Sequence, residues 1–161
     1  MMRGMLFLIL LWPGLALGQD LDPGPMTPTA WDDYKRAAEL YNGGARLQAG
    51  CVMYRGQFRA RLMMMADPDL PPDGAPALFA SLNEMVARPI NQWLGGDRDD
   101  WIAVLECARQ WAAENDDPDY PRRRYGAEHA RVLAGLEELI DALPSQAELR
   151  AQRRAAGLPN R

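Results

Sequence analysis

Apolar residues recur every three or four positions along most of this chain, a spacing typical of α-helices with one buried face. No segment alternates apolar and polar residues as a half-buried strand would. The pattern predicts five helices, each ended by Gly, Pro or a break rich in Asn and Asp. They cover about residues 29–42, 45–66, 76–89, 97–114 and 122–143. We therefore expect an all-α protein, a compact bundle of four to six helices.

The second of these segments, from about Ala45 to Ala66, is predicted to be the central buried helix. Apolar or small residues occupy two opposite arcs of it: Leu47, Cys51, Tyr54, Phe58, Leu62 and Met65 on one, and Ala49, Val52, Gly56, Ala60 and Met63 on the other. A helix that is apolar on two faces usually packs between neighbours. Gly56 and Ala60 lie one turn apart, so a neighbouring helix should approach closely there.

Local signals mark several helix ends. Thr29 with Asp32, and Ser145 with Glu148, resemble capping boxes, and the second pair predicts a short basic helix that ends at Gly157. Pro89 should end or kink the third helix. Residues 90–96 (INQWLGG) then form a short linker that could contain one helical turn, with Trp93 as its anchor.

The first eighteen residues have the features of a signal peptide. Arg3 precedes an unbroken apolar run over residues 6–12, and small residues lead up to Gly18. Cleavage near Gly18–Gln19 would leave a flexible, proline-rich arm over 19–28, a helical domain over 29–144, and a short C-terminal helix and tail over 145–161. The alternative is that the apolar run stays as an uncleaved anchor.

Charge and hydropathy limit the classes of function. The chain has a formal net charge of −4 and a single lysine, Lys35, so nucleic-acid binding has no electrostatic support. No later segment is apolar enough for stable membrane insertion of the mature chain. Together with the signal peptide, these features predict a periplasmic or secreted protein.

Two cysteines in an exported chain favour one disulfide, Cys51–Cys107. By the chain-entropy model such a bond stabilises the fold by roughly 4 kcal/mol. The two helices that carry these cysteines should then be adjacent. Free or metal-binding thiols are the alternative, although no C-x-x-C spacing and no nearby histidine supports it.

The candidate binding residues lie on the predicted central helix and on the linker. Arg55, Arg59 and Arg61 share a helix that contains no Asp or Glu, so they need carboxylates from elsewhere or a ligand. One hypothesis is a site for an anion or an acidic partner, formed by the three arginines with Gln57 and rimmed by Arg88, Asn91 and Trp93. The other is internal pairing, with Glu39, Glu84, Asp100 or Glu106.

Other reactive side chains favour structural roles. His129 is the only histidine and lies on an apolar arc, where we expect local partners for its ring nitrogens. Met63, Met64 and Met65 point about 100° apart on a helix and cannot converge on one copper ion. No catalytic or cofactor motif is present, so we expect no cofactor, no metal and no catalytic residues, and an enzyme is the weaker hypothesis.

The leading functional hypothesis is a protein–protein interaction module, such as an inhibitor, an immunity-type protein or an envelope assembly protein. Its partner would be another envelope protein. The alternative is a periplasmic protein that binds a small anionic ligand or a metal, and a carboxylate-dependent enzyme comes third.

Overall fold

The computed structural model describes residues 21–160, and the regular secondary structure of this part of the chain is all helical, without a strand. The predicted signal peptide over residues 1–18 and its cleavage site lie outside the described residues. The helices are α1 (Ala30–Asn42), α2 (Arg46–Ala66), α3 (Ala75–Leu82), the π-helix η1 (Asn83–Ala87), α4 (Arg88–Leu94), α5 (Arg98–Glu114), α6 (Arg122–Asp141) and α7 (Gln146–Ala155).

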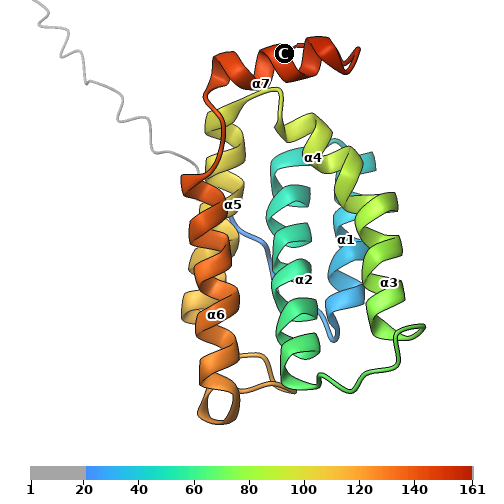
Figure 1. The fold of residues 1–161 in the computed structure, drawn as a ribbon, viewed down its shortest axis with the longest axis vertical. Coiled ribbons are helices and arrows are strands. Elements are labelled where there is room, and N and C mark those ends of the chain that lie inside the picture. The colour runs from blue at the N-terminus through green and yellow to red at the C-terminus, as the bar shows by residue number, and fades with distance from the viewer. Residues whose placement is uncertain (1–20, 161) are drawn as a thin grey trace, which may run out of the picture.

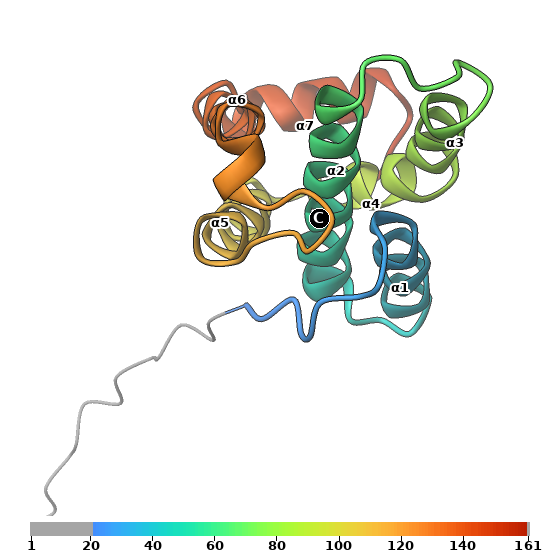
Figure 2. The ribbon, with the colours of Figure 1, turned by 90° about the horizontal axis from the view of Figure 1, so that it is seen from below.

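The helices are arranged around α2. Figure 1 shows α5 and α6 on one side of it and α1 and α3 on the other, while α7 lies across one end of the bundle. Seen along the helices, α2 occupies the centre (Figure 2). Every residue from 51 to 60 is buried, so the prediction of a central buried helix is confirmed.

Two glycines of α2 allow this central position. A Cβ atom on Gly56 would lie 2.9 Å from Cβ of Asp33 in α1, and one on Gly50 would lie 2.8 Å from Cγ1 of Val104 in α5. Both distances are too short for real carbon atoms, so a side chain at either position would push a neighbouring helix away. The expected close approach at Gly56 is confirmed, and α1 is the helix that makes it.

The helix starts follow the capping signals of the sequence. Thr29 and Asp32 form a complete capping box at α1, and Ser145 and Glu148 form another at α7. Asp97 caps α5 by accepting hydrogen bonds from two backbone N–H groups of its first turn. These bonds satisfy donors that a helix N-terminus would otherwise leave unpaired.

The chain around Pro89 differs from the prediction. Residues 75–94 are continuously helical, because the wide turn η1 leads from α3 into α4, and the expected linker is helical as far as Leu94. In a regular α-helix the ring of Pro89 would collide with a carbonyl of the preceding turn. The wider π turn, in which the N–H of Arg88 bonds to the carbonyl of Asn83, leaves room for the ring.

The segment that the sequence assigned to a flexible arm also differs. Residues 21–28 lie against the bundle, and Figure 2 shows them passing α5 and α2 to reach α1. The carbonyl oxygens of Gly24 and Thr27 accept hydrogen bonds of 3.0 Å from Arg55 and Arg59, respectively. Buried arginines of α2 therefore hold this segment, a contact that its proline-rich composition does not reveal.

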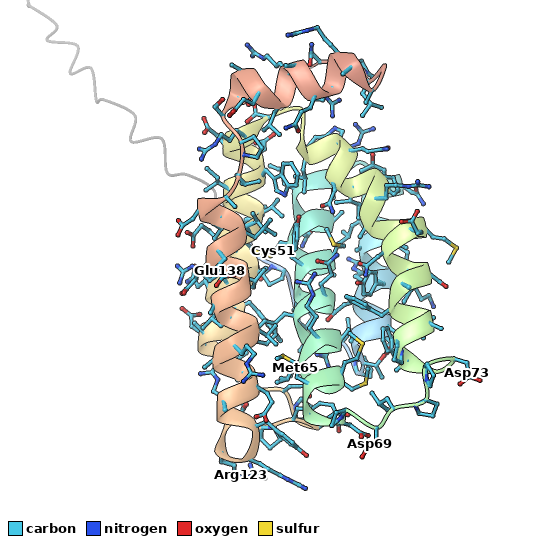
Figure 3. All side chains as sticks on the ribbon, in the orientation of Figure 1. Cys51, Met65, Asp69, Asp73, Arg123 and Glu138 are labelled. Atoms are coloured by element: carbon cyan, nitrogen blue, oxygen red, sulfur yellow. A yellow bond between two sulfur atoms is a disulfide. The ribbon has the colours of Figure 1, made fainter. Side chains whose placement is uncertain are left out.

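Cys51 of α2 and Cys107 of α5 form a disulfide with Cα atoms 5.8 Å apart, as predicted. Cys51 is fully buried, and Figure 3 labels it on the upper half of α2. Such a bond is typical of proteins that mature in an oxidising compartment. Among the described residues, no helix is both long enough and apolar enough to span a membrane.

Candidate functional site

Arg55 and Arg59 lie in the interior rather than at a binding surface. Their side chains are 0% and 2% exposed. Asp33 of α1 accepts hydrogen bonds from both guanidinium groups, at 2.6 Å from Arg55 and 3.1 Å from Arg59. Asp117, in the loop before α6, accepts a bond of 2.8 Å from Nε of Arg59. Two buried positive charges are thus balanced by two buried negative ones.

The carboxylates that pair with Arg55 and Arg59 are not the ones expected from the sequence. Because both arginines are paired inside the fold, they are no longer candidate binding residues. Three of the acids proposed as partners instead pair with arginines of their own segments: Glu39 with Arg36, Glu84 with Arg88, and Glu106 with Arg109. Arg55 and Arg59 are saturated by carboxylates and carbonyl oxygens, so the internal-pairing hypothesis describes both of them.

A cleft of about 500 Å³ lies between α2, the η1–α4 segment and α7. Gln57, Arg61, Arg88 and Asn91, all predicted as binding residues, line it. Trp93 does not line this cleft; it is half-buried, and the guanidinium of Arg46 lies 5.6 Å from its ring centre. The structure therefore brings together four of the seven predicted residues, which come from segments about 30 positions apart in sequence.

One wall of the cleft is a chain of hydrogen bonds that orients Asn91. The indole N–H of Trp101 donates to the hydroxyl of Tyr54, and that hydroxyl donates to Oδ1 of Asn91, each over 2.9 Å. An indole nitrogen can only donate, so the Tyr54 hydroxyl must give its own proton to the amide oxygen of Asn91. Burial raises the pKa of Tyr54 to about 12, which keeps this proton in place. The amide N–H groups of Asn91 are left for another acceptor.

Hydrogen bonds to the side-chain oxygen also orient the carboxamide of Asn83. Its Oδ1 accepts from the hydroxyl of Tyr34 at 2.9 Å and from Nε2 of Gln57 at 2.8 Å. Burial also raises the pKa of Tyr34, so its hydroxyl stays a donor. Asn83 begins the π turn η1, and Asn91 lies two turns further on in α4. Both carboxamides line the cleft with their oxygens already bonded, so their nitrogens are the groups available to a ligand.

Arg153 of α7 closes the cleft and was not predicted from the sequence. It is 8% exposed, and its guanidinium donates to the carbonyl oxygens of Gln92 and Pro159. Within residues 21–160 it forms no ion pair with a carboxylate. A guanidinium has five N–H donors, and these carbonyl contacts leave some of them unused. Arg153 is therefore a nearly buried cation without a described counter-ion, beside an open cavity.

Positive charge predominates around the cleft. Arg61, Arg88 and Arg153 line it, and Glu84 is the single carboxylate among the lining residues. Glu84 pairs with Arg88 over 3.2 Å at the exposed rim. Arg61 forms no ion pair within the described part of the chain, and its guanidinium lies 5.9 Å from the ring centre of Phe79. The cleft is thus electropositive on a chain whose net charge is −4.

His129 lies away from this cleft and does not have the partners expected from the sequence. Its ring is 4% exposed and packs edge-on against Phe58 at 5.0 Å. Its Nε2 atom is buried and has no hydrogen-bond partner in the described part of the chain. Burial, with the nearby positive charge of Arg122, lowers the pKa of His129. Among the described residues, no three His, Cys, Asp or Glu side chains are grouped as metal ligands would be.

Comparison of the chain with protein-family models, with curated proteins and with solved structures gave no match.

Proposed function

We propose that this protein is an exported binding protein whose basic cleft takes a small organic anion. The observation that carries the proposal is Arg153, a cation that is 8% exposed and forms no ion pair with a described carboxylate. A buried charge without a counter-ion is costly, because carbonyl dipoles replace only part of its hydration. A carboxylate in the adjoining cleft would supply the missing negative charge and two strong hydrogen-bond acceptors.

The neutral groups of the cleft favour the same kind of ligand. The amide nitrogens of Asn83 and Asn91 are directed away from their bonded oxygens and offer N–H donors, and Arg61 adds a second cation. Because hydrogen bonds to buried side chains already orient these two carboxamides, they can bind a carboxylate without a large loss of side-chain entropy. A positively charged ligand would meet two guanidinium groups that form no ion pair within residues 21–160, and is disfavoured.

The dimensions of the cleft favour a small molecule over a protein surface. Its volume of about 500 Å³ lies within the range of pockets that bind small ligands. Large exposed apolar side chains in the described part of the chain are Met26, Leu78 and Met85, too few for the apolar centre of a protein interface. The alternative from the sequence analysis, a small anionic ligand, therefore has more support than an interaction module.

The lining residues favour binding over catalysis. They include no His, Cys, Ser or Lys, the side chains that most often act as nucleophiles or bases near neutral pH. The buried disulfide Cys51–Cys107 favours an oxidising compartment, and with the predicted signal peptide it supports a periplasmic location.

The proposal can be tested by NMR titration of the mature chain, residues 19–161, with benzoate. Binding in the cleft should shift the side-chain amide signals of Asn83 and Asn91 and the indole N–H signal of Trp101. Arg61→Gln should weaken binding by about fivefold, since an exposed charge contributes up to about 1 kcal/mol. Arg61 is exposed, so its loss should leave the fold intact.

The matched control for this titration is Arg36→Gln. Arg36 is an exposed arginine of α1 that pairs with Glu39 and lines no described cavity. Arg36→Gln changes the net charge by the same amount as Arg61→Gln, and it should leave the affinity for benzoate unchanged. The proposal is wrong if benzamide, which lacks the charge, produces the same shifts, or if the two variants bind benzoate equally well.

A further inference from the structure

A second hollow adjoins the basic cleft and has a different character. It has a volume of about 270 Å³ and lies between α2 and α6. Its walls are Met64, Met65, Val132 and Gly135, with Arg61 and Arg131 at its edges. Figure 3 labels Met65 near the lower end of α2. The hollow is thus mainly apolar, and methionine side chains, which are unbranched and flexible, adapt readily to an apolar guest.

Arg61 lines both cavities, which are therefore neighbours. It lines the cleft with Gln57 and Asn91, and it lines the hollow with Met64 and Met65. Gln57 and Met65 are eight residues apart on α2, which corresponds to about 12 Å along the helix axis. A ligand that reaches from one cavity into the other must pass the guanidinium of Arg61 and would be elongated.

We infer that the ligand is a single-chain amphiphile, an alkyl carboxylate whose head lies in the cleft and whose tail lies in the hollow. This inference rests on the proposed function, because it takes the cleft as the site of the anionic group. The carboxylate would bind the amide nitrogen of Asn91 and the guanidinium of Arg153. The alkyl chain would pass Arg61 and cover Met64, Met65 and Val132.

The sizes of the cavities favour this ligand over a segment of another protein. The cleft, at about 500 Å³, and the hollow, at about 270 Å³, together remain within the range of small-molecule pockets. The cleft contains the polar groups Asn83, Asn91 and Arg153, and the hollow is mainly apolar, which matches a molecule with one charged head and one apolar tail. A peptide would instead need hydrogen-bond partners for its backbone along the whole groove.

Gly135 allows the tail site to be blocked without disturbing the fold. A Cβ atom built on Gly135 meets nothing within 4 Å, so Gly135→Leu would extend its side chain into the hollow. Gly126 provides the matched control, because it also lies in α6 and an added Cβ atom there likewise meets nothing within 4 Å. Gly126 lines none of the described cavities.

The experiment is isothermal titration calorimetry of the mature chain with butyrate, hexanoate, octanoate and decanoate, with octanol as the uncharged comparison. Affinity should rise by up to about fourfold for each added CH₂ group, as expected for burial of an alkyl chain. Gly135→Leu should abolish the rise among the longest chains, from octanoate to decanoate, while butyrate binds as before, and Gly126→Leu should leave the whole series unchanged.

The possible failures are distinguishable. If all four carboxylates bind with one affinity, the cleft takes an anion but the hollow takes no tail, and the inference is overturned while the proposed function stands. If octanol binds as tightly as octanoate, and Arg61→Gln changes neither affinity, both the inference and the proposed function are overturned. A rise with chain length that Gly135→Leu does not affect would place the tail elsewhere and also overturn the inference.

Discussion

Replacing Asp33 by asparagine should destabilise the protein far more than the loss of an exposed charge. Asp33 is fully buried and pairs with both Arg55 and Arg59, and its Oδ1 also accepts the hydroxyl proton of Thr27. Asparagine keeps the size of the side chain but removes the negative charge and turns its amide N–H groups toward one of the two guanidinium groups. Within residues 21–160, Asp117 then remains as the single carboxylate for two buried cations.

The expected loss in free energy of unfolding follows from the buried positive charge that Asp33→Asn leaves uncompensated. Removing one partner of a buried ion pair typically costs about 3–5 kcal/mol, because the other charge stays buried and uncompensated. Glu39→Gln, on the exposed face of the same helix, should cost less than about 1 kcal/mol, since its pair with Arg36 is about half exposed. The variants should therefore differ by several kcal/mol in free energy of unfolding.

Urea denaturation followed by circular dichroism measures this difference, with the disulfide kept oxidised in every variant. The double variant Asp33→Asn/Arg55→Gln should lose less stability than the two single variants added together, because it leaves fewer unpaired charges in the interior. If Asp33→Asn and Glu39→Gln unfold at the same urea concentration, the two arginines are not neutralised as described and the internal-pairing account fails.

Two further predictions concern the core. Gly56→Leu should lower the free energy of unfolding by more than about 3 kcal/mol, because its Cβ atom alone would lie 2.9 Å from Cβ of Asp33; coincident thermal melts of variant and parent would contradict this. Burial lowers the pKa of His129 from its ordinary value of 6.5, so the unfolded chain takes up this proton at a higher pH than the folded chain does. Stability should therefore be complete above pH 6.5 and fall as the pH drops below it. His129→Leu should reduce this dependence in melts recorded between pH 7 and pH 4.5, and an unchanged dependence would show that other groups cause it.

The helices were predictable because their signals are local. The capping residues Thr29 and Ser145 act within one turn of their own helices, and the two-sided apolar pattern of α2 directly reflects its central position. The disulfide was predictable because only two cysteines are present. The π turn before Pro89 was not predictable, since its wider hydrogen bonding depends on how the rest of the segment packs.

The site was harder to predict because it depends on contacts between distant segments. Arg59 and Asp117 are 58 positions apart, and no periodicity in the sequence pairs them. Arg61 was identified because its helix contains no acid, and it does reach a cleft. Arg153 was missed because it is one of several arginines in a short basic helix, and its burial arises only when α7 folds across the end of the bundle, as Figure 1 shows.

The most direct test of the central claim is a crystal structure of residues 19–161 with octanoate. We expect the carboxylate to lie in the cleft between α2, α4 and α7, within hydrogen-bond distance of the amide nitrogen of Asn91 and the guanidinium of Arg153. A structure in which octanoate binds at another surface, while this cleft holds only water and the guanidinium of Arg153 pairs with a carboxylate of the protein itself, would contradict it.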